Sequence, residues 1–453
     1  MTAAHPGPDP VNAPRVVHLQ GLPPADYADL LLRTEGDLSA YLDPVREIID
    51  AVRERGDEAL ADFARRFDKA PSVTAETLKA TPADFEAAFK SVDPEVIESI
   101  RFAIDNIRRF HQAQMPEEMW LKEMHPGVFA GDRVRPIPSV ACYVPRGKGS
   151  FPSVVMMTTV PAVVAGVPRV IVLTPPGPDG KVDAATLVAA RLAGVEDVYK
   201  CGGAQGVAAV AYGTETVPRC VKVVGPGSPW VLAGKKLLAD RIDPGIPAGP
   251  SESVILADAT ADGALAALDL LVEAEHGPDS SAYLVTDSQA VADAAVAALP
   301  GYWAQMGAER AGFSQTVLSG PRGGIIVAPD FNAAVAFTND YAPEHLMIHG
   351  REPFAHLGRI ENAGEILLGE STPIPLGNFV LGPNAVLPTG RNARTWSALS
   401  VFDYLKRTSV GYVTRDGYKA LAPHAHRLAV YEGFEAHANA VSPLRDEIMK
   451  RGR

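Results

Sequence analysis

The sequence contains little cysteine, no run of lysine or arginine, and no clean apolar stretch of membrane-spanning length. Its three cysteines, Cys142, Cys201 and Cys220, adjoin apolar residues and lack the spacing of metal ligands, so we expect reduced and mostly buried thiols. The formal net charge is −12, and no basic segment suggests a nucleic-acid or membrane surface. These absences favour a cytoplasmic protein whose partners are small molecules or another copy of the chain.

The two segments that could be mistaken for membrane or targeting sequences lack the required features. The longest apolar stretch, KGSFPSVVMMTTVPAVVAGV, is interrupted by Pro152 and Pro161 well short of the roughly 20 apolar residues that a membrane-spanning helix needs. The first residues, MTAAHPGPDPVNAPR, have neither the basic nor the apolar region of a signal peptide. We interpret residues 1–38 as a flexible leader.

Two patterns of apolar residues divide the rest of the chain, which at 453 residues is too long for one ordinary core. Residues 39–127 place apolar residues three and four apart, which predicts a helical region. Short β-branched runs then alternate with helix-like segments over 128–250 and over 251–390, which predicts two α/β domains with parallel sheets. Residues 391–453 form a loop-rich stretch and a helical tail.

The segment LVEAEHG places acidic residues and a histidine at a predicted helix end. Glu273 and His276 stand three residues apart, so one helix face could present both to a single ion. A helix-end histidine that only donates to a carboxylate would give the same spacing, and that alternative stays open. Glu275 should point elsewhere, as a solvated or capping acid.

Two further groups of titratable residues stand out. Glu344 and His345 precede a predicted buried strand in NDYAPEHLMI, where adjacent groups suit general acid and base catalysis, although a surface loop would look the same. His437 follows Glu432 in the predicted helix EGFEAHANAV. A single histidine of this kind is more typical of a packed residue than of a ligand.

The G-x-G-x-x-G fingerprint of dinucleotide-binding domains is absent. Three other glycine-containing turns, YVPRGKG, GGAQG and GPGS, could bring backbone amides close to a phosphate. Glycine turns at strand ends are common in α/β proteins, so these turns alone name no cofactor.

Taken in order, seven segments resemble those of histidinol dehydrogenases, the NAD-dependent zinc enzymes that complete histidine biosynthesis. They are GGAQGVAAVAYGTETVP, AGPSE, EAEHG, APEHL, GPNAVLPT, LSVFDYLKRTS and EGFEAHANAV, and the resemblance covers roughly residues 40–445. It implies two incomplete Rossmann-like domains with helical N-terminal and C-terminal parts. It also implies a homodimer in which residues 391–453 complete the partner subunit's active site.

The resemblance assigns catalytic and binding roles by position. Glu344 and His345 correspond to the catalytic bases: His345 would take the alcohol proton as hydride leaves for NAD, and Glu344 would activate water for attack on the aldehyde. A second hydride transfer would then give a carboxylate. The implied NAD contacts are Tyr143, Gln205 and Ser228, of which the last replaces an asparagine, and the implied substrate contacts are Ser251, Glu432 and position 385.

The implied zinc ligands depart from the family at two positions. A glutamine, a histidine, an aspartate and a second histidine correspond here to Glu273, His276, Asn378 and His437. The changes are reciprocal, amide to carboxylate at 273 and carboxylate to amide at 378, so the protein charge facing the metal is unchanged. We therefore expect zinc binding to be retained.

The implied substrate pocket has also changed, because Ala385 stands where the family usually has a histidine that faces the substrate. A pocket without this hydrogen-bonding partner discriminates less well for a polar substrate. The leading hypothesis is a paralogue that oxidises a small polar primary alcohol, which need not be L-histidinol. A true L-histidinol dehydrogenase and a non-catalytic binding homologue are the alternatives.

Overall fold

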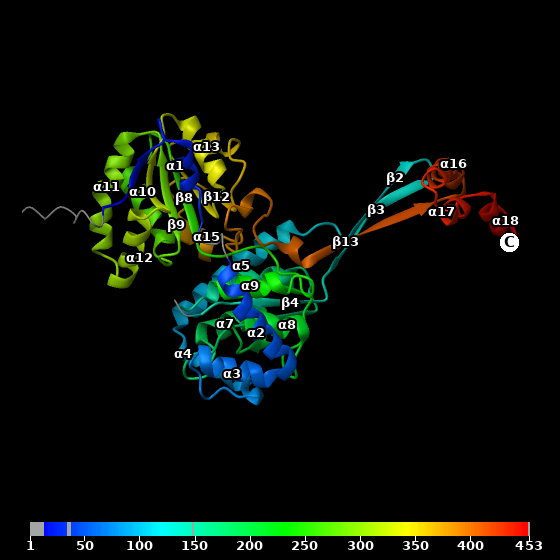
Figure 1. Ribbon diagram of the computed structural model, residues 1–453, viewed down its shortest axis with the longest axis horizontal. Helices are drawn as coiled ribbons and strands as arrows, with labels where there is room; N and C mark the ends of the chain where they lie inside the picture. The colour runs from blue at the N-terminus through cyan, green and yellow to red at the C-terminus, as the bar shows by residue number, and fades with distance from the viewer. Residues whose placement is uncertain (1–12, 34–37, 147–148, 452–453) are drawn as a thin grey trace, which may run out of the picture. The chain divides into compact units, whose positions relative to one another are not determined.

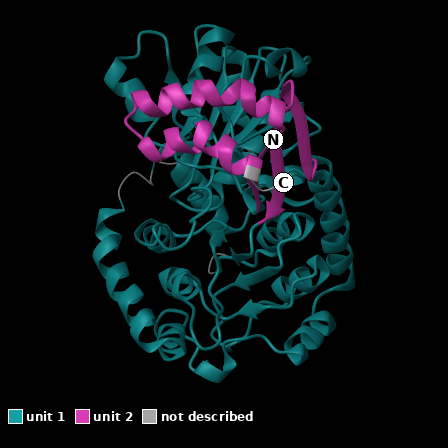
Figure 2. Cartoon of the chain, turned by 90° about the vertical axis from the view of Figure 1, so that its right-hand side faces the viewer, with its two compact units in different colours: residues 1–114, 137–404 teal, residues 115–136, 405–453 magenta. Residues whose placement is uncertain are grey.

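The computed structural model describes residues 13–33, 38–146 and 149–451, and its α-helices and β-strands are labelled in chain order (Figure 1). The chain divides into two compact units, which have different colours in Figure 2. Unit 1 comprises residues 1–114 and 137–404, and unit 2 comprises residues 115–136 and 405–453. Unit 1 contains two parallel sheets with helices between their strands, so the predicted α/β fold is confirmed.

The smaller sheet of unit 1 has four parallel strands in the order β6-β5-β4-β7, and a helix follows each strand. Strand β4 is buried along its whole length, as expected for a parallel strand that is covered on both faces. The elements are β4 Ser139–Tyr143, α6 Pro152–Val164, β5 Arg169–Leu173, α7 Ala184–Ala193, β6 Val198–Tyr199, α8 Gly203–Tyr212, β7 Lys222–Val224 and α9 Pro229–Leu237.

The helices before this sheet share its core. Val45 and Leu60, from the first two of these helices, lie in one apolar cluster with Ala141 of β4. The next two helices pack against α7 and α6. The four helices are α2 Ser39–Arg55, α3 Asp57–Phe67, α4 Pro82–Ser91 and α5 Pro94–Gln114.

The larger sheet of unit 1 has six parallel strands in the order β1-β10-β9-β8-β11-β12. One face packs against α10, α11 and α12 through residues such as Leu270 and Leu318, and the other packs against α1 and α13 through Leu30 and Phe337. The strands are β1 Val16–His18, β8 Glu252–Ala257, β9 Ser281–Thr286, β10 Gly323–Val327, β11 His345–His349 and β12 Glu365–Leu368. The helices are α1 Pro24–Leu30, α10 Gly263–Ala274, α11 Gln289–Trp303, α12 Ala308–Ser319, α13 Phe331–Tyr341, α14 Phe354–Leu357 and α15 Ile374–Phe379.

The interpretation of residues 1–38 as a flexible leader is wrong for residues 13–33. Strand β1 adds to the larger sheet as a parallel edge strand beside β10, and α1 packs on one face of that sheet. A strand of three residues is too short to show periodicity, and its main-chain hydrogen bonds come from a strand more than 300 positions away. Residues 1–12 and 34–37 of that prediction lie outside the described residues.

Unit 2 consists of an antiparallel sheet and three helices. The strands are β2 Met119–His125, β3 Val128–Pro136 and β13 Leu405–Val413, in the order β13-β3-β2, and the helices are α16 Arg415–Tyr431, α17 Glu435–Ala440 and α18 Pro443–Arg451. Strand β2 therefore ends the region predicted as helical, and β13 precedes the helices of the predicted tail. Both strands depend on pairing with β3, which local patterns do not reveal.

Two expectations from composition can be compared with this fold. Cys142, Cys201 and Cys220 are buried and unpaired, as predicted, and burial raises the pKa of Cys142 to about 12. Within the described ranges, none of the helices combines the length and the apolar character needed to cross a membrane.

Candidate active site

The candidate catalytic residues lie at the amino ends of three neighbouring strands of the larger sheet. Strand β11 begins at His345 and lies between β8 and β12, so that His345 pairs in register with Ser253 on one side and Glu365 on the other. Helix α10 follows β8 and runs back across the sheet, which returns its last turn, with Glu273, to the same edge. The parallel topology thus gathers side chains that are far apart in sequence.

His345 is the centre of this group of side chains. Its Nδ1 lies 2.5 Å from Oε1 of Glu365, and its Nε2 lies 3.8 Å from Oε1 of Glu273 and 3.8 Å from Oε1 of Glu344. Its side chain is only 4% exposed. Burial lowers the pKa of this imidazole, but the three carboxylates outweigh burial and raise the pKa to about 10.

Glu344 is held at the same edge by the backbone. Its Oε2 accepts a hydrogen bond of 2.9 Å from the amide of Glu252, which leaves Oε1 on the side of His345. Burial raises the pKa of Glu344 well above its ordinary value, and the positive charge of His345 opposes this shift. A buried carboxyl of this kind can hold or accept a proton near neutral pH.

Three of the four predicted zinc ligands, Glu273, His276 and Asn378, are in contact. Oε1 of Glu273 accepts a hydrogen bond of 3.0 Å from Nδ2 of Asn378, and its Oε2 lies 3.1 Å from Nδ1 of His276. Glu273 is 1% exposed; burial would raise its pKa, but the charges of two histidines and hydrogen bonds from Asn378 and Ser251 together lower it. Glu273 is therefore a buried carboxylate whose lowered pKa favours its ionised form.

The atoms of this group suit a zinc site. Nδ1 of His276 lies 3.1 Å from the carbonyl oxygen of Val272 as well, which keeps the hydrogen on Nδ1 and leaves Nε2 for a metal. The imidazole is 42% exposed beside the buried Glu273, and Asn378 offers its oxygen as a further donor. Among the described residues, however, no three His, Cys, Asp or Glu side chains form a complete metal site.

The remaining predicted ligand and one substrate residue belong to unit 2. His437 lies on α17 and is exposed, and its ring is tilted by 40° against that of Phe434, with ring centres 5.1 Å apart. Glu432 follows the last residue of α16 and is also exposed. His437 is thus not the packed histidine that its segment alone favours.

The two other predicted substrate residues are in unit 1. Ser251 directly precedes β8 and hydrogen-bonds to Glu273. Ala385 is partly exposed on a segment anchored by the buried Asn384, whose Nδ2 donates to the carbonyl of Met157 at 2.6 Å. Ser251 is therefore part of the group around Glu273, whereas Ala385 lies on the segment that follows α15.

The predicted cofactor residues each lie at or after the carboxyl end of a strand of the smaller sheet. The hydroxyl of Tyr143, at the end of β4, accepts a hydrogen bond of 3.1 Å from the amide of Gly203, and Gln205 lies in the same first turn of α8. Ser228 is the residue before α9. The turn after β7 approaches Tyr143 so closely that a Cβ on Gly225 would lie 2.1 Å from the Tyr143 carbonyl oxygen. Such an edge is where open parallel sheets bind ligands.

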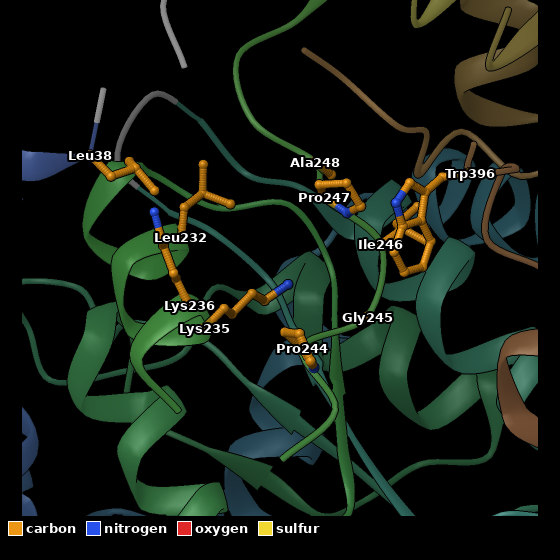
Figure 3. A pocket seen from close by; sticks show the side chains of 10 residues that line it. All are labelled: Leu38, Leu232, Lys235, Lys236, Pro244, Gly245, Ile246, Pro247, Ala248 and Trp396. Carbon is orange, nitrogen blue, oxygen red and sulfur yellow. The ribbon is translucent and has the colours of Figure 1, made fainter. Parts of the chain in front are cut away.

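A cavity of about 330 Å3 lies beside α9 (Figure 3). The 3% exposed Lys235 lines it, and its Nζ donates a hydrogen bond of 2.8 Å to the carbonyl of Gly225. Burial lowers the pKa of Lys235 to about 8, and Asp243 opposes this shift. The lining residues are Leu38, Leu232, Lys235, Lys236, Pro244, Gly245, Ile246, Pro247, Ala248 and Trp396.

The sequence interpretation missed two residues of this edge. Glu365 contacts His345, and Glu252 forms a buried ion pair of 2.8 Å with Arg33. In both cases an acidic residue begins an apolar strand, as in AGEILLG and PSESVILAD. A charged residue at the start of a buried strand is the signal that could have identified them.

Comparison with known proteins identifies the family. Residues 31–444 match the model of the family described as histidinol dehydrogenase. A histidinol dehydrogenase from a Synechocystis species is 47% identical over 94% of this chain and 98% of its own length. The chain belongs to the histidinol dehydrogenase family. The resemblance seen in the seven sequence segments is therefore confirmed.

A further relative and a solved structure agree with membership of the histidinol dehydrogenase family. A protein from Colwellia psychrerythraea named histidinol dehydrogenase homolog is 63% identical over 93% of this chain and 94% of its own. The crystal structure of histidinol dehydrogenase from Elizabethkingia anophelis has a TM-score of 0.90 and 29% identity, and the match covers 96% of this chain and 98% of that chain. The fold is thus that of a histidinol dehydrogenase.

Proposed function

We propose that the protein is a zinc-dependent, NAD-linked dehydrogenase that oxidises a small polar primary alcohol through the aldehyde to the carboxylate. The observation that carries this proposal is the convergence of Glu344, His345 and Glu273 at one buried edge of the larger sheet. Bound zinc would supply a Lewis acid for the substrate oxygen, and bound NAD would accept hydride.

His345 is the base for the first oxidation. Because Glu365 occupies its Nδ1, the imidazole can accept the alcohol proton only at Nε2, the nitrogen on the side of Glu273 and Glu344. A divalent cation on Glu273 would offset the charge of that carboxylate and lower the pKa of His345 towards the range of an effective base.

Glu344 serves the second oxidation. Its Oε2 is held by the Glu252 amide, and Oε1 can take a proton from the water that attacks the aldehyde. Bound NAD would accept the second hydride from the hydrated aldehyde, which would leave the carboxylate. Two NAD molecules would then be reduced for each alcohol oxidised.

Zinc and cofactor are assigned to separate residues. Glu273, His276 and Asn378 would hold zinc, together with His437 of the partner subunit in a homodimer. This assignment is supported by the exposed position of His437 and by the one carboxylate, one imidazole and one amide already in contact. Tyr143, Gln205 and Ser228 would bind NAD at the carboxyl edge of the smaller sheet. Glu432 of the partner subunit would contact the substrate. We place the enzyme in the cytoplasm.

The proposed substrate is a small polar alcohol other than L-histidinol. Ala385 supports this choice, since it removes the side chain with which the family usually faces the substrate. The 63% identical protein is also named a histidinol dehydrogenase homolog, whereas the 47% identical one is named histidinol dehydrogenase. A true L-histidinol dehydrogenase is the second candidate, supported by the name histidinol dehydrogenase of the relatives at 43% and 47% identity.

Steady-state kinetics separates these candidates. The zinc-loaded protein would be assayed with NAD and a panel of small polar primary alcohols that includes L-histidinol. We expect one alcohol to yield two NADH per molecule with a kcat/KM at least about 100-fold above that of L-histidinol. If L-histidinol is the best substrate, the second candidate is correct, and if no alcohol yields NADH, the protein is a binding homologue.

A further inference from the structure

Glu365 is a buried carboxylate to which the family resemblance assigns no role. It begins β12 and is 7% exposed at the side chain, and its Oε1 lies 2.5 Å from Nδ1 of His345, which is 4% exposed. We propose that Glu365 is a positioning residue, which holds the Nδ1 hydrogen of His345 and so keeps Nε2 as the basic nitrogen on the substrate side. This inference rests on the proposed function of His345 as the base.

The contact follows from the strand pairing. Residues 345 and 365 are partners in the parallel ladder between β11 and β12, so the two backbones fix the separation of the two side chains. Within the part of the chain that the structure describes, Nε2 of His345 has no such contact: its distances of 3.8 Å to Glu273 and Glu344 are too long for hydrogen bonds. The imidazole is therefore anchored at one nitrogen and free at the other.

The chemistry of the two groups decides the tautomer. The carboxylate oxygen of Glu365 accepts a hydrogen bond from Nδ1, so in the neutral imidazole the hydrogen is on Nδ1 and the lone pair is on Nε2. Without Glu365 the ring could carry the hydrogen on either nitrogen and could rotate about its side-chain bonds. Both changes would reduce the fraction of enzyme that is ready to accept the alcohol proton.

Glu365 also lies close to the segment that carries the proposed metal ligand Asn378. The segment passes so closely over the carboxylate that a Cβ on Gly377 would lie 3.1 Å from Oε2 of Glu365. Glu365 is thus confined between His345 and Gly377. This confinement restricts the carboxylate to the orientation in which it contacts the imidazole.

The kinetic test uses Glu365→Ala and Glu365→Gln, with Glu361→Gln as a control at an exposed glutamate of the preceding loop. Relative to the wild type, we expect Glu365→Ala to lower kcat roughly 100-fold with KM for the alcohol changed less than about threefold. Glu365→Gln should lose less, because its amide oxygen can still accept the Nδ1 hydrogen. The control should match the wild type, and all variants should bind the same amount of zinc.

A double-mutant cycle separates positioning from a merely structural role. If Glu365 acts through His345, Glu365→Ala should cause no further loss of kcat in a His345→Gln protein. An equal loss in both backgrounds, or no loss in Glu365→Ala alone, would overturn the proposal.

A spectroscopic measurement keeps this inference distinct from the proposed activity. The zinc-loaded protein without substrate should show a low-field proton resonance from Nδ1–H of His345, identified by its disappearance in His345→Gln. This resonance should be lost in Glu365→Ala and shifted in Glu365→Gln, whether or not any alcohol is oxidised. Its persistence unchanged in both Glu365 variants would contradict the assigned role, and Glu365→Gln alone decides the matter if Glu365→Ala does not fold.

Discussion

Asn378 donates a hydrogen bond of 3.0 Å to Glu273, so the two exchanged positions of the proposed zinc site are in direct contact. Under the proposed assignment of the zinc ligands, an amide and a carboxylate have changed places across this contact, which would leave the same two groups and the same charge at nearly the same location. Two independent losses of function would have no reason to compensate at neighbouring side chains. The contact is therefore the main structural support for a retained metal site.

Glu344→Gln should separate the two oxidations. The variant should still convert the alcohol to the aldehyde, but the loss of the group that activates water should slow the second oxidation roughly 100-fold or more. NADH formed per alcohol should fall from two towards one, with aldehyde detectable by a trapping reagent. An unchanged ratio of two would show that another group activates the water.

Ala385→His tests the assignment of the substrate pocket. Introducing the histidine that the proposed assignment gives to the family at this position should raise kcat/KM for L-histidinol by about 10-fold or more and lower it for the preferred alcohol, because the new side chain offers a hydrogen bond and fills space. Ala385→Leu fills space without a hydrogen bond and should not gain activity towards L-histidinol. Equal effects of both variants on kcat/KM would show that Ala385 does not line the substrate pocket.

The ion pair between Arg33 and Glu252 should stabilise the fold strongly. Arg33 donates from Nε to Glu252 at 2.8 Å, stacks 3.3 Å from the ring centre of Tyr341, and both charged side chains are at most 6% exposed. Arg33→Met would leave a buried carboxylate unpaired and should lower the free energy of unfolding by about 3–5 kcal/mol. Urea denaturation measures this change.

The matched control for this pair is Arg394→Met. Arg394 pairs with Asp340 at 3.6 Å, but these side chains are 40% and 52% exposed. We expect a loss below about 1 kcal/mol for this variant. Similar losses in the free energy of unfolding for Arg33→Met and Arg394→Met would contradict the claim that burial makes the first ion pair more stabilising.

Lys235 should make stability depend on pH. Its pKa is lowered from 10.5 to about 8 in the folded protein, so between these values the unfolded chain binds more protons and stability rises with pH. Below pH 8, the cost of burying the charged Lys235 lowers the free energy of unfolding by its full amount, about 3 kcal/mol. Above pH 10.5 this cost vanishes, because Lys235 is then neutral in both states.

Lys235→Met removes this titration. The wild type should therefore gain about 2 kcal/mol relative to Lys235→Met between pH 7.5 and pH 10, as measured by urea denaturation. Lys236→Met, at the next and exposed position, should show no such trend. A difference between wild type and Lys235→Met that is independent of pH would contradict the lowered pKa of Lys235 in the folded protein.

The sequence predicts the parallel strands well and the site contacts less well. Runs such as SVILAD and HLMIHG are apolar, rich in β-branched or long side chains, and bounded by turn residues, so β8 and β11 could be located from local pattern alone. Strands β1, β2 and β13 could not, since each depends on a partner distant in sequence or is largely exposed. Glu365 was missed for a related reason: its contact with His345 depends on the register between β11 and β12.

The zinc content of three proteins tests the central claim most directly. The wild type, Glu273→Gln, and Glu273→Gln combined with Asn378→Asp would be dialysed against the same dilute chelator, and zinc per chain would be measured by atomic absorption. We expect the single variant to lose zinc, because it lacks the carboxylate of the ligand set, and the double variant to recover most of it. Equal zinc content in all three proteins would contradict the reciprocal exchange between Glu273 and Asn378.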